Sequence, residues 1–379
     1  MRVVDLFSGC GGLSKGFELA DFELTLAVEQ WGAARDVYGL NFDHPAKGLD
    51  LNNVQEASAL VRRERPELIM GGPPCQEFSI AGSRVEGSKA LLTLRFAEIV
   101  TSVLPQWFVV ENVTGIAKST TWSAARKILS AAGYGITECV LNAAYYGVPQ
   151  NRKRFFAIGS LGEEDGFLSS QLEFGQTEDP LSIRAYVGDE FGVDFYYRHP
   201  RTWGRRGVFS IDEPSPTIRS TNRPVPPGYT PHQNDAGPSA VARALTIVER
   251  ARIQSFPREF KLAGTLTDQN TMVANAVPVL LAEHVAAAIR RYEEKRTMKS
   301  DPAFREWLTT KHEYTPRSAS NVISRLTRVS RILHTNRSSC DPLDIIHVLE
   351  RHQEFNALST SVKSQIRRAV RLHAEFLTK

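Results

Sequence analysis

The chain has 379 residues, of which 42% are hydrophobic and 23% charged, and its formal net charge is +4. This length exceeds the roughly 100 to 200 residues of one typical domain, so two or three folded units are expected. A secretory leader and an apolar run of about 18 residues are both lacking, which argues against secretion and membrane insertion and indicates a cytoplasmic protein. The four cysteines lack the spacing of a zinc site, so neither zinc nor disulfides are expected.

The net charge hides an asymmetry between the body and the C-terminal tail. From Lys295 to Lys379 there are 16 Lys and Arg against 8 Asp and Glu, which leaves 30 against 34 in the rest of the chain. A basic segment on a near-neutral body is typical of a protein with a polyanionic partner, and equally of a solvated surface.

The first half of the chain alternates short apolar runs with amphipathic stretches. Strands are predicted at 1–7, 24–30, 67–72 and 107–113, and helices at 93–104 and 122–133. This rhythm is typical of a doubly wound α/β domain with a parallel sheet. Ligands of such sheets bind beyond the carboxyl ends of the strands, where the candidate functional residues also lie, so one shared cleft is expected.

The second half changes in character twice. Residues 161–238 are rich in Gly, Pro, Arg and aromatic residues and are expected to be dominated by loops. Helical patterns return at 243–256 and 277–296. A second helical set follows after Met298, including 318–333 with an apolar stripe along one side.

The run "DLFSGCGGLS" places Gly9, Gly11 and Gly12 in the first strand-to-helix turn, where missing side chains let a ligand approach the backbone. The turn serves tight packing about as readily as ligand binding. Ser14 stands where a nicotinamide dinucleotide fingerprint has a glycine, which weakens that interpretation. Glu29 and Asp50 are suitably placed to accept hydrogen bonds from a ribose and an adenine, so an adenosine cofactor without a pyrophosphate fits best.

The stretch "GGPPCQEFS" presents Cys75 on a loop that two prolines stiffen. A thiol is only a few per cent thiolate at neutral pH, and a nearby cation such as Arg152 or Arg154 of "QNRKR" would raise that fraction. Glu111 ends another strand, where burial would raise its pKa enough to hold a proton. Each residue also has a structural explanation, as a packed thiol, a surface arginine or a capping carboxylate.

Six blocks occur in the order of a known family: "DLFSGCGG", "GGPPCQEFS", "ENV", "QNRKR", "RALTIVERARIQSFP" and "NAVP". Over residues 1 to about 290 the chain resembles the DNA (cytosine-5) methyltransferases. The resemblance implies an S-adenosylmethionine-dependent methyltransferase domain of Rossmann-like α/β fold, with a small irregular target-recognition domain. It implies domains at 1–160 plus 263–297 for catalysis and cofactor binding and at 161–262 for recognition, followed by a basic helical extension at 298–379.

The resemblance also implies a mechanism. Cys75 attacks C6 of a cytosine, so that C5 attacks the methyl group of the cofactor, and loss of the C5 proton then expels the thiolate. Glu111 delivers a proton at the N3 edge, while Arg154, and Arg152 beside it, steady O2. Because C6 is stacked inside a duplex, the nucleotide has to be flipped out of the helix.

Cofactor contacts carry over by the same resemblance, with S-adenosylhomocysteine as product and no metal. The residues implied are Phe7, Gly9, Gly11, Gly12, Glu29, Asp50, Pro74, Leu94, Asn275 and Val277. Two positions depart from the family pattern. Ala274 replaces a usual glycine, and the tryptophan after the acidic residue is displaced by one, so that Gln30 precedes Trp31.

Sequence readout is expected in the irregular region, which contains six arginines suited to bidentate contacts with guanine or with phosphates: Arg198, Arg201, Arg205, Arg206, Arg219 and Arg223. Contact with phosphates alone remains open for each of them. The tail is interpreted as a DNA-binding module, with partner docking and a solubilising cap as alternatives.

Together these features predict a bacterial, monomeric modification enzyme that acts on double-stranded DNA in the cytoplasm and associates with the nucleoid while acting. A cognate restriction endonuclease would be its functional but not physical partner, and no membrane would be involved. Two alternatives stay open: an RNA (tRNA) cytosine-5 methyltransferase and a catalytically silent DNA-binding protein on the same fold.

Overall fold

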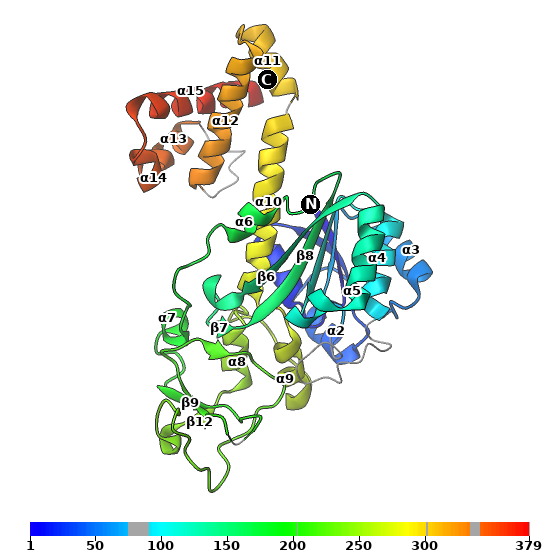
Figure 1. Ribbon diagram of the computed structural model, residues 1–379, viewed down its shortest axis with the longest axis vertical. Helices are drawn as coiled ribbons and strands as arrows, with labels where there is room; N and C mark the ends of the chain where they lie inside the picture. Colours follow the sequence, from blue (N-terminus) through cyan, green and yellow to red (C-terminus); the bar gives the residue numbers. More distant parts are fainter. Residues whose placement is uncertain (75–90, 203, 301, 334–341, 379) are drawn as a thin grey trace. The chain divides into compact units, whose positions relative to one another are not determined.

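A seven-stranded β-sheet forms the centre of the larger part of the molecule (Figure 1). The computed structural model describes residues 1–74, 91–202, 204–300, 302–333 and 342–378. In spatial order the strands are β3 (Ala46–Lys47), β2 (Glu23–Val28), β1 (Arg2–Leu6), β4 (Leu68–Gly71), β5 (Trp107–Asn112), β8 (Lys153–Leu161) and β6 (Tyr134–Asn142). This sheet confirms the predicted α/β class, and β1 to β5 run parallel as expected.

Strand β8 departs from the expected parallel pattern, because it runs antiparallel to both β5 and β6. β6 ends at Asn142 and β8 begins at Lys153. The connection is too short for the crossover of a dozen or more residues that a parallel return needs. The reversal matters for the site, since it sets the beginning of β8 beside the end of β5, with Glu111 opposite Phe156 and Asn112 opposite Phe155.

Helices cover both faces of this sheet (Figure 1). On one face α3 (Val54–Arg63), α4 (Leu91–Val103) and α5 (Thr120–Ala131) bury their apolar stripes against β1, β2, β4 and β5. On the other face α1 (Gly12–Leu19) packs against the beginning of α10 (Val279–Ser300) so closely that a Cβ at Gly16 would lie 2.4 Å from Ala282 Cβ. The helix α2 (Gly32–Gly39) and the 3-10 turn η1 (Thr114–Lys118) complete this part.

Short elements separated by loops make up residues 162–246. They are α6 (Ser169–Glu173), α7 (Ile183–Val187), β9 (Phe195–Tyr197), β10 (Val208–Ser210), β11 (Ser215–Pro216), η3 (Ser239–Val241) and β12 (Arg243–Ala244). The strands β10, β9 and β12 form a small sheet, and β11 pairs with β7 (Gln150–Asn151), which follows the turn η2 (Ala143–Tyr145). The helices α8 (Ile247–Ile253) and α9 (Leu266–Asn275) share an apolar core with this region.

The chain divides into two compact units, Met1–Ala288 and Ile289–Lys379. The second unit is helical and has an apolar core of its own. Its helices are α11 (Pro302–Lys311), α12 (Pro316–Leu333), α13 (Pro342–Glu350), α14 (Gln353–Asn356) and α15 (Thr360–Leu377). Residues 266–294, which include α9 and the beginning of α10, contain an 18-residue stretch that is apolar enough to cross a membrane. Of that stretch, 67% is buried inside the protein, as in a core helix.

A chain of buried polar groups lies beneath the first strand-to-helix turn. Ser14 Oγ donates to Asp5 Oδ2 (2.5 Å), the Tyr38 hydroxyl donates to Ser14 Oγ (2.7 Å), and a 2.7 Å hydrogen bond joins Tyr38 to His44. Asp5 is fully buried, and burial raises its pKa to about 8, against the lowering effect of the Ser14 hydrogen bond. The Asp5 carboxyl therefore carries a proton at neutral pH in the folded protein.

The raised pKa of Asp5 predicts a pH-dependent stability. The unfolded carboxyl loses its proton near pH 3.8 and the folded one near pH 8, so between these values the folded state binds more protons and its stability falls as pH rises. Asp5→Asn removes this penalty. As pH rises through that window, the free energy of unfolding of the variant, minus that of the wild type, should increase by up to about 1.4 kcal/mol per pH unit, as measured by urea denaturation.

Asp36→Asn, which alters an exposed carboxylate of α2, serves as the control and should follow the wild-type curve. Parallel curves for Asp5→Asn and the wild type between pH 4 and pH 8 would contradict the assignment of a neutral Asp5.

Candidate active site

An ion pair lies where the end of β5 meets the beginning of β8. Arg154 Nε donates to Glu111 Oε1 at 2.9 Å, and the two side chains are only 13% and 11% exposed. The antiparallel direction of β8 creates this meeting, because residue 154 would lie at the opposite edge of the sheet in a parallel strand. The structure thus brings together Glu111 and Arg154, which the sequence analysis selected separately.

Glu111 has a raised pKa, although it has a cationic partner. Desolvation is the largest effect, and the charges of Arg154 and then Arg152 oppose it. Arg154 binds Oε1. Oε2 lies 3.1 Å from where a side chain at Gly72 would begin, so the glycine leaves room beside that oxygen. A carboxyl that is anchored at one oxygen and has a raised pKa is suited to hold or share a proton with a ligand.

The segment that leads to Cys75 is fixed next to this carboxyl. Asn112 Nδ2 donates to the carbonyl of Pro73 at 3.0 Å, and Gly71 packs on β1, where a Cβ would lie 2.3 Å from the Leu6 carbonyl oxygen. Pro74, one of the expected cofactor residues, is partly buried and ends this described stretch. Cys75 itself lies outside the described residues, so its predicted role rests on its position in the sequence.

Arg152 is placed differently from Arg154. Its side chain is almost fully buried, and its guanidinium donates to the carbonyls of Ala274 (2.7 Å), Ala276 (3.0 Å) and Ile218 (3.4 Å). The buried Ala274, at which a glycine was expected, takes part in this contact through its backbone. These contacts of Arg152 thus tie "QNRKR" to "NAVP" and to the segment that follows β11 (Ser215–Pro216).

Two buried glutamines extend this network. Gln150 Nε2 donates to Gln254 Oε1 at 2.7 Å and Gln150 Oε1 accepts from the Ile218 amide at 2.9 Å. Gln254 in turn donates to the carbonyl of Val273 at 2.5 Å. With Asn112, these glutamines are the positioning residues that sequence reasoning missed. Their signal was a polar side chain within or directly after an apolar run, which pays its desolvation cost only when it has fixed partners.

The first turn has the properties of a ligand-binding loop. Phe7 adopts a left-handed backbone with φ 61°, which is rare for a bulky residue and characteristic of functional sites. Gly9, with φ 56°, faces open space, since a Cβ there would meet no atom within 4 Å. Gly11, with φ 100°, packs instead against the rings of Phe42 and Tyr38.

Glu29 connects this turn with the end of β2. Its carboxylate accepts from the Gly9 amide at 2.9 Å and from the Trp31 amide at 2.7 Å. A carboxylate has about four acceptor positions, so two such bonds leave capacity for ribose hydroxyls. Trp31 itself packs on the apolar core beside α2.

The other expected cofactor residues lie on separate elements. A Cβ at Gly12 would lie 2.4 Å from the Val277 carbonyl, so Gly12 and the buried Val277 bring the two distant blocks into contact. Asn275 is exposed at the end of α9, and Leu94 of α4 packs partly buried on the core. Asp50 is exposed and accepts hydrogen bonds from Asn52 at 3.0 Å. Gly9, which leaves open space, and the acceptor Glu29 fit an adenosine-bearing ligand.

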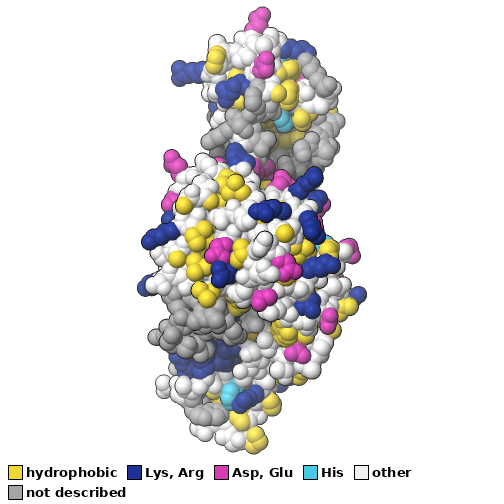
Figure 2. Space-filling view, turned by 90° about the vertical axis from the view of Figure 1, so that its right-hand side faces the viewer, with side chains coloured by type: hydrophobic (Ala, Val, Ile, Leu, Met, Phe, Trp, Pro, Cys, Tyr) yellow, Lys and Arg dark blue, Asp and Glu magenta, His cyan; other side chains and the backbone are white. Residues whose placement is uncertain are grey.

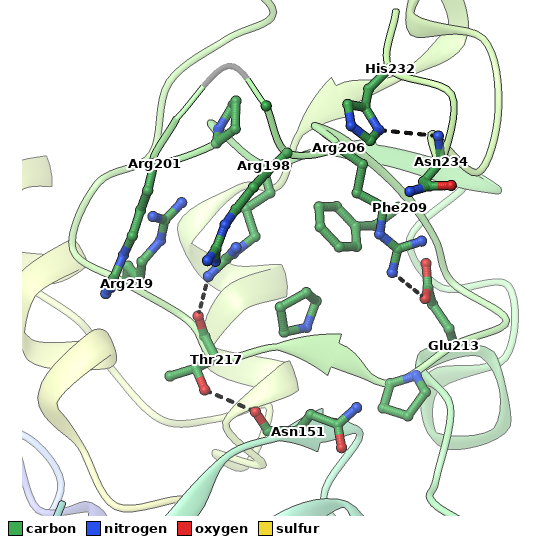
Figure 3. Close-up of a pocket in the computed structure, with 15 residues that line it drawn as sticks. Asn151, Arg198, Arg201, Arg206, Phe209, Glu213, Thr217, Arg219, His232 and Asn234 are labelled. Atoms are coloured by element: carbon green, nitrogen blue, oxygen red, sulfur yellow. Dashed lines mark hydrogen bonds and ion pairs between the residues drawn. The ribbon is translucent and has the colours of Figure 1, made fainter. Parts of the chain in front are cut away.

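Five of the six selected arginines line a groove of about 650 Å³ in the recognition region: Arg198, Arg201, Arg205, Arg206 and Arg219 (Figure 3). Arg223 is exposed and is not part of the lining. Figure 2 shows a patch of Lys and Arg side chains over this region, in the lower part of the view. The groove also touches the segment that leads into β8, because Thr217 Oγ1 donates to the Asn151 carbonyl at 2.8 Å.

The arginines of the groove fall into two kinds. Arg206 lies 4.2 Å from the centre of the Phe209 ring and donates to Glu213 at 2.6 Å, which fixes its orientation. Arg198 donates to the Thr217 carbonyl at 2.9 Å, and burial, together with the charges of Arg219 and Arg201, lowers its pKa to about 10. Among the described residues, Arg198 forms no ion pair with a carboxylate, so its positive charge is uncompensated.

The chain was compared with known proteins. The family model for C-5 cytosine-specific DNA methylases matches residues 1–291. The type II methyltransferase M.HindV of Haemophilus influenzae is 49% identical over 300 residues, which cover 78% of this chain and 98% of that protein. The type II methyltransferase M.HgiDI of Herpetosiphon aurantiacus is 45% identical over 300 residues, covering 79% of this chain and 97% of that protein.

A solved structure shares the fold. The Dnmt2 methyltransferase of S. pombe superposes with a TM-score of 0.58 at 19% identity, over 76% of this chain and 98% of that one. The family match spans more than half of the chain, and two relatives exceed 40% identity over nearly their whole length. The chain therefore belongs to the C-5 cytosine-specific DNA methylases and is an enzyme of that family.

Proposed function

We propose that this enzyme transfers a methyl group from S-adenosylmethionine to C5 of a cytosine that has been flipped out of double-stranded DNA, through a covalent bond between Cys75 and C6. The observation that carries the proposal is the buried pair of Glu111 and Arg154, which lies beside the fixed segment that leads to Cys75. A nucleophile, a proton donor and a cation at one place are what addition to a pyrimidine ring requires.

Each residue has one part in the reaction. The Cys75 thiolate adds to C6 as Glu111 shares a proton with N3, and the electron pair of the C5–C6 double bond moves to C5, which becomes nucleophilic. After methylation a general base accepts the C5 proton, the C5–C6 double bond re-forms and the Cys75 thiolate leaves C6. Arg154 orients Glu111 and faces the O2 side of the ring, while Arg152 acts through the backbone carbonyls that it holds.

The burial of Glu111 supports base flipping. Its side chain is 11% exposed at the end of an interior strand, where a base still stacked in a duplex has no access. Extruding the nucleotide costs a few kcal/mol of stacking and pairing, which contacts elsewhere on the DNA must offset.

The open face of the first turn supports S-adenosylmethionine as the cofactor. Glu29 would accept hydrogen bonds from the ribose hydroxyls, Gly9 would let the ligand approach the backbone, and Val277 would border the same cleft. When bound, S-adenosylmethionine supplies an electrophilic methyl group on a sulfonium sulfur. The reaction needs no metal, since the chain's own carboxyl, thiol and guanidinium perform the proton and charge transfers.

The biological role follows from the relatives. M.HindV and M.HgiDI are type II methyltransferases by name, which supports a restriction-modification enzyme that protects DNA from a cognate endonuclease in the cytoplasm. We assign it to act as a monomer.

The first test of this function is methylation of duplex DNA, mapped by bisulfite sequencing after expression in cells that lack cytosine methylation. We expect methylated cytosines in one short sequence context, and no transfer to tRNA. Methylation confined to RNA, or no transfer to either substrate, would reject the proposal. Cys75→Ser should lower turnover by more than about a thousandfold while leaving DNA binding largely intact.

Cys139→Ser is the matched control for that variant. Burial raises the pKa of the Cys139 thiol to about 12, so this group stays protonated, and the variant should keep its activity. DNA that contains 5-fluorocytosine should trap a covalent adduct with the wild type and with Cys139→Ser only.

Glu111→Gln tests the proton donor. The amide keeps the shape of the side chain but cannot deliver a proton, so we expect the rate of methyl transfer to fall by about 10² to 10⁴ with little change in DNA affinity. In the wild type the rate should decline as pH rises through the raised pKa of Glu111, and this decline should be missing in the variant.

Glu138→Gln serves as its control, because Glu138 forms a similar ion pair with Arg126 (3.0 Å) at the exposed surface of β6. A surface change of this kind should alter stability by less than about 0.5 kcal/mol and leave the rate unchanged. Equal rates for Glu111→Gln and the wild type would remove Glu111 from the mechanism.

The two kinds of arginine support a division of DNA contacts in the groove. Arg206, which Phe209 and Glu213 hold in one orientation, is suited to the bidentate reading of guanine O6 and N7. Arg198, Arg201, Arg205 and Arg219 form no ion pair within the described part of the groove and are suited to phosphates. Arg223 would contact phosphate outside the groove.

The double variant Arg201→Gln with Arg205→Gln tests the phosphate contacts. We expect weaker binding to all duplexes, with the slope of log K against log salt reduced by about 1.8, because each neutralised phosphate contributes about 0.9. The control is Arg63→Gln with Arg258→Gln, which removes the same charge at exposed positions outside the groove and should preserve the slope. A loss confined to the target sequence would instead assign these arginines to base reading.

A further inference from the structure

The second unit lies outside what this enzyme shares with its relatives. The family match ends at residue 291, and the relatives align over 97–98% of their own length while covering only 78–79% of this chain. Residues 289–379 nevertheless form a compact helical unit with its own apolar core. A folded addition of this kind calls for a function of its own.

The two longest helices of this unit cross and pack against each other, as Figure 1 shows. α12 turns Val322, Leu326 and Val329 into the core, and α15 contributes Ile366 and Val370 to the same core. Beside this core the two helices also share a hydrogen-bonded contact, where the Arg325 guanidinium donates twice to Gln365 Oε1 at 2.7 and 3.1 Å.

A second contact joins α15 to the segment before α12. The Arg368 guanidinium lies 5.5 Å from the centre of the ring of Tyr314, which stands two residues before α12. Arg325 and Arg368 therefore lie along one seam between the helices, with Arg328 one turn beyond Arg325 and Arg371 one turn beyond Arg368.

Basic residues far outnumber acidic residues in these two helices. The sequence of α12 contains four arginines and no acidic residue, and that of α15 contains four basic residues and a single acid, Glu375, near its end. Some basic residues of the unit are compensated, as in the ion pair of Arg367 with Glu350 at 2.9 Å. Arg317, Arg328 and Arg371 have no ion pair within the part of the unit that the structure describes.

Small polar side chains accompany the arginines. Ser324 on α12 and Ser364 on α15 are exposed on the outward sides, beside Arg328 and Arg368. Hydroxyl groups of this kind donate to phosphate oxygens, and together with arginine they are typical of surfaces that hold a nucleic acid backbone. From Arg317 to Arg328 the helix rises about 16 Å, at about 1.5 Å per residue. This matches roughly five base pairs of about 3.4 Å each.

We propose that this surface, the α12–α15 face, defined by Arg317, Ser324, Arg325, Arg328, Arg368 and Arg371, binds the phosphate backbone of duplex DNA outside the recognised sequence. The inference rests on the proposed function only in taking duplex DNA as the substrate. The face adds sequence-independent affinity, which raises the local concentration of target sites around the enzyme and reduces the dependence of binding on the recognition groove alone.

The test uses the full-length enzyme with Arg328→Gln and Arg371→Gln combined. We expect the slope of log K against log salt, measured between 50 and 200 mM on a duplex without the target, to fall by about 1.8, with thermal unfolding unchanged. The control is Lys311→Gln with Arg351→Gln, two exposed residues of the same unit that are not among the six that define this face, and it should retain the wild-type slope.

Two results would overturn the inference. The first is an equal salt slope for the two double variants, whether both keep the wild-type slope or both lose the same amount. The second is a loss of affinity for folded RNA with none for duplex DNA, which would make RNA the ligand of this face. The readout is binding and not methyl transfer. A reduced slope in an enzyme that methylates nothing would therefore sustain this inference while rejecting the proposed function.

Discussion

One buried guanidinium sets the geometry on which the rest of the site depends. Arg152 stands directly before β8 and donates to the backbone carbonyls of Ile218, Ala274 and Ala276, which lie 66, 122 and 124 residues later in the chain. Leaving a buried carbonyl without its donor costs about 1–3 kcal/mol, so these contacts strongly favour a single arrangement of the segments. The charge of Arg152 also lowers the pKa of Glu111, although less than the charge of Arg154 does. Arg152 therefore affects both the positions of these segments and the protonation of Glu111.

The balance at Glu111 shows how opposing effects make a usable acid. Burial alone would keep the carboxyl neutral, and a close guanidinium alone would keep it ionised. Here desolvation is larger than the attraction of Arg154 and Arg152, and the pKa ends above its ordinary value. A raised pKa favours the protonated carboxyl, which is the form that the proposed proton transfer to a cytosine requires.

Much of this arrangement was readable from the sequence because parallel strands end at one edge. Once 67–72 and 107–113 were assigned as strands, the rule for α/β sheets placed Pro74 and Glu111 together. The direction of β8 was missed, since it depends on the length of a connection and not on an apolar pattern. The separate roles of Arg152 and Arg154 were also beyond reach, because the carbonyls that hold Arg152 come from distant segments. Asp5 was passed over, as a polar residue in a strand shows its protonation only after burial is known.

The docking of β11 on β7 has a consequence for how new target specificities arise. The register pairs Ser215 with Gln150 and Pro216 with Asn151, and the Ser215 amide donates to the Pro149 carbonyl at 2.9 Å. Such main-chain contacts place few demands on side-chain identity, so the loops that precede them are free to diversify without disturbing the chemistry next door. If these loops read the DNA as proposed, a change of target sequence would leave the contacts between β11 and β7 intact.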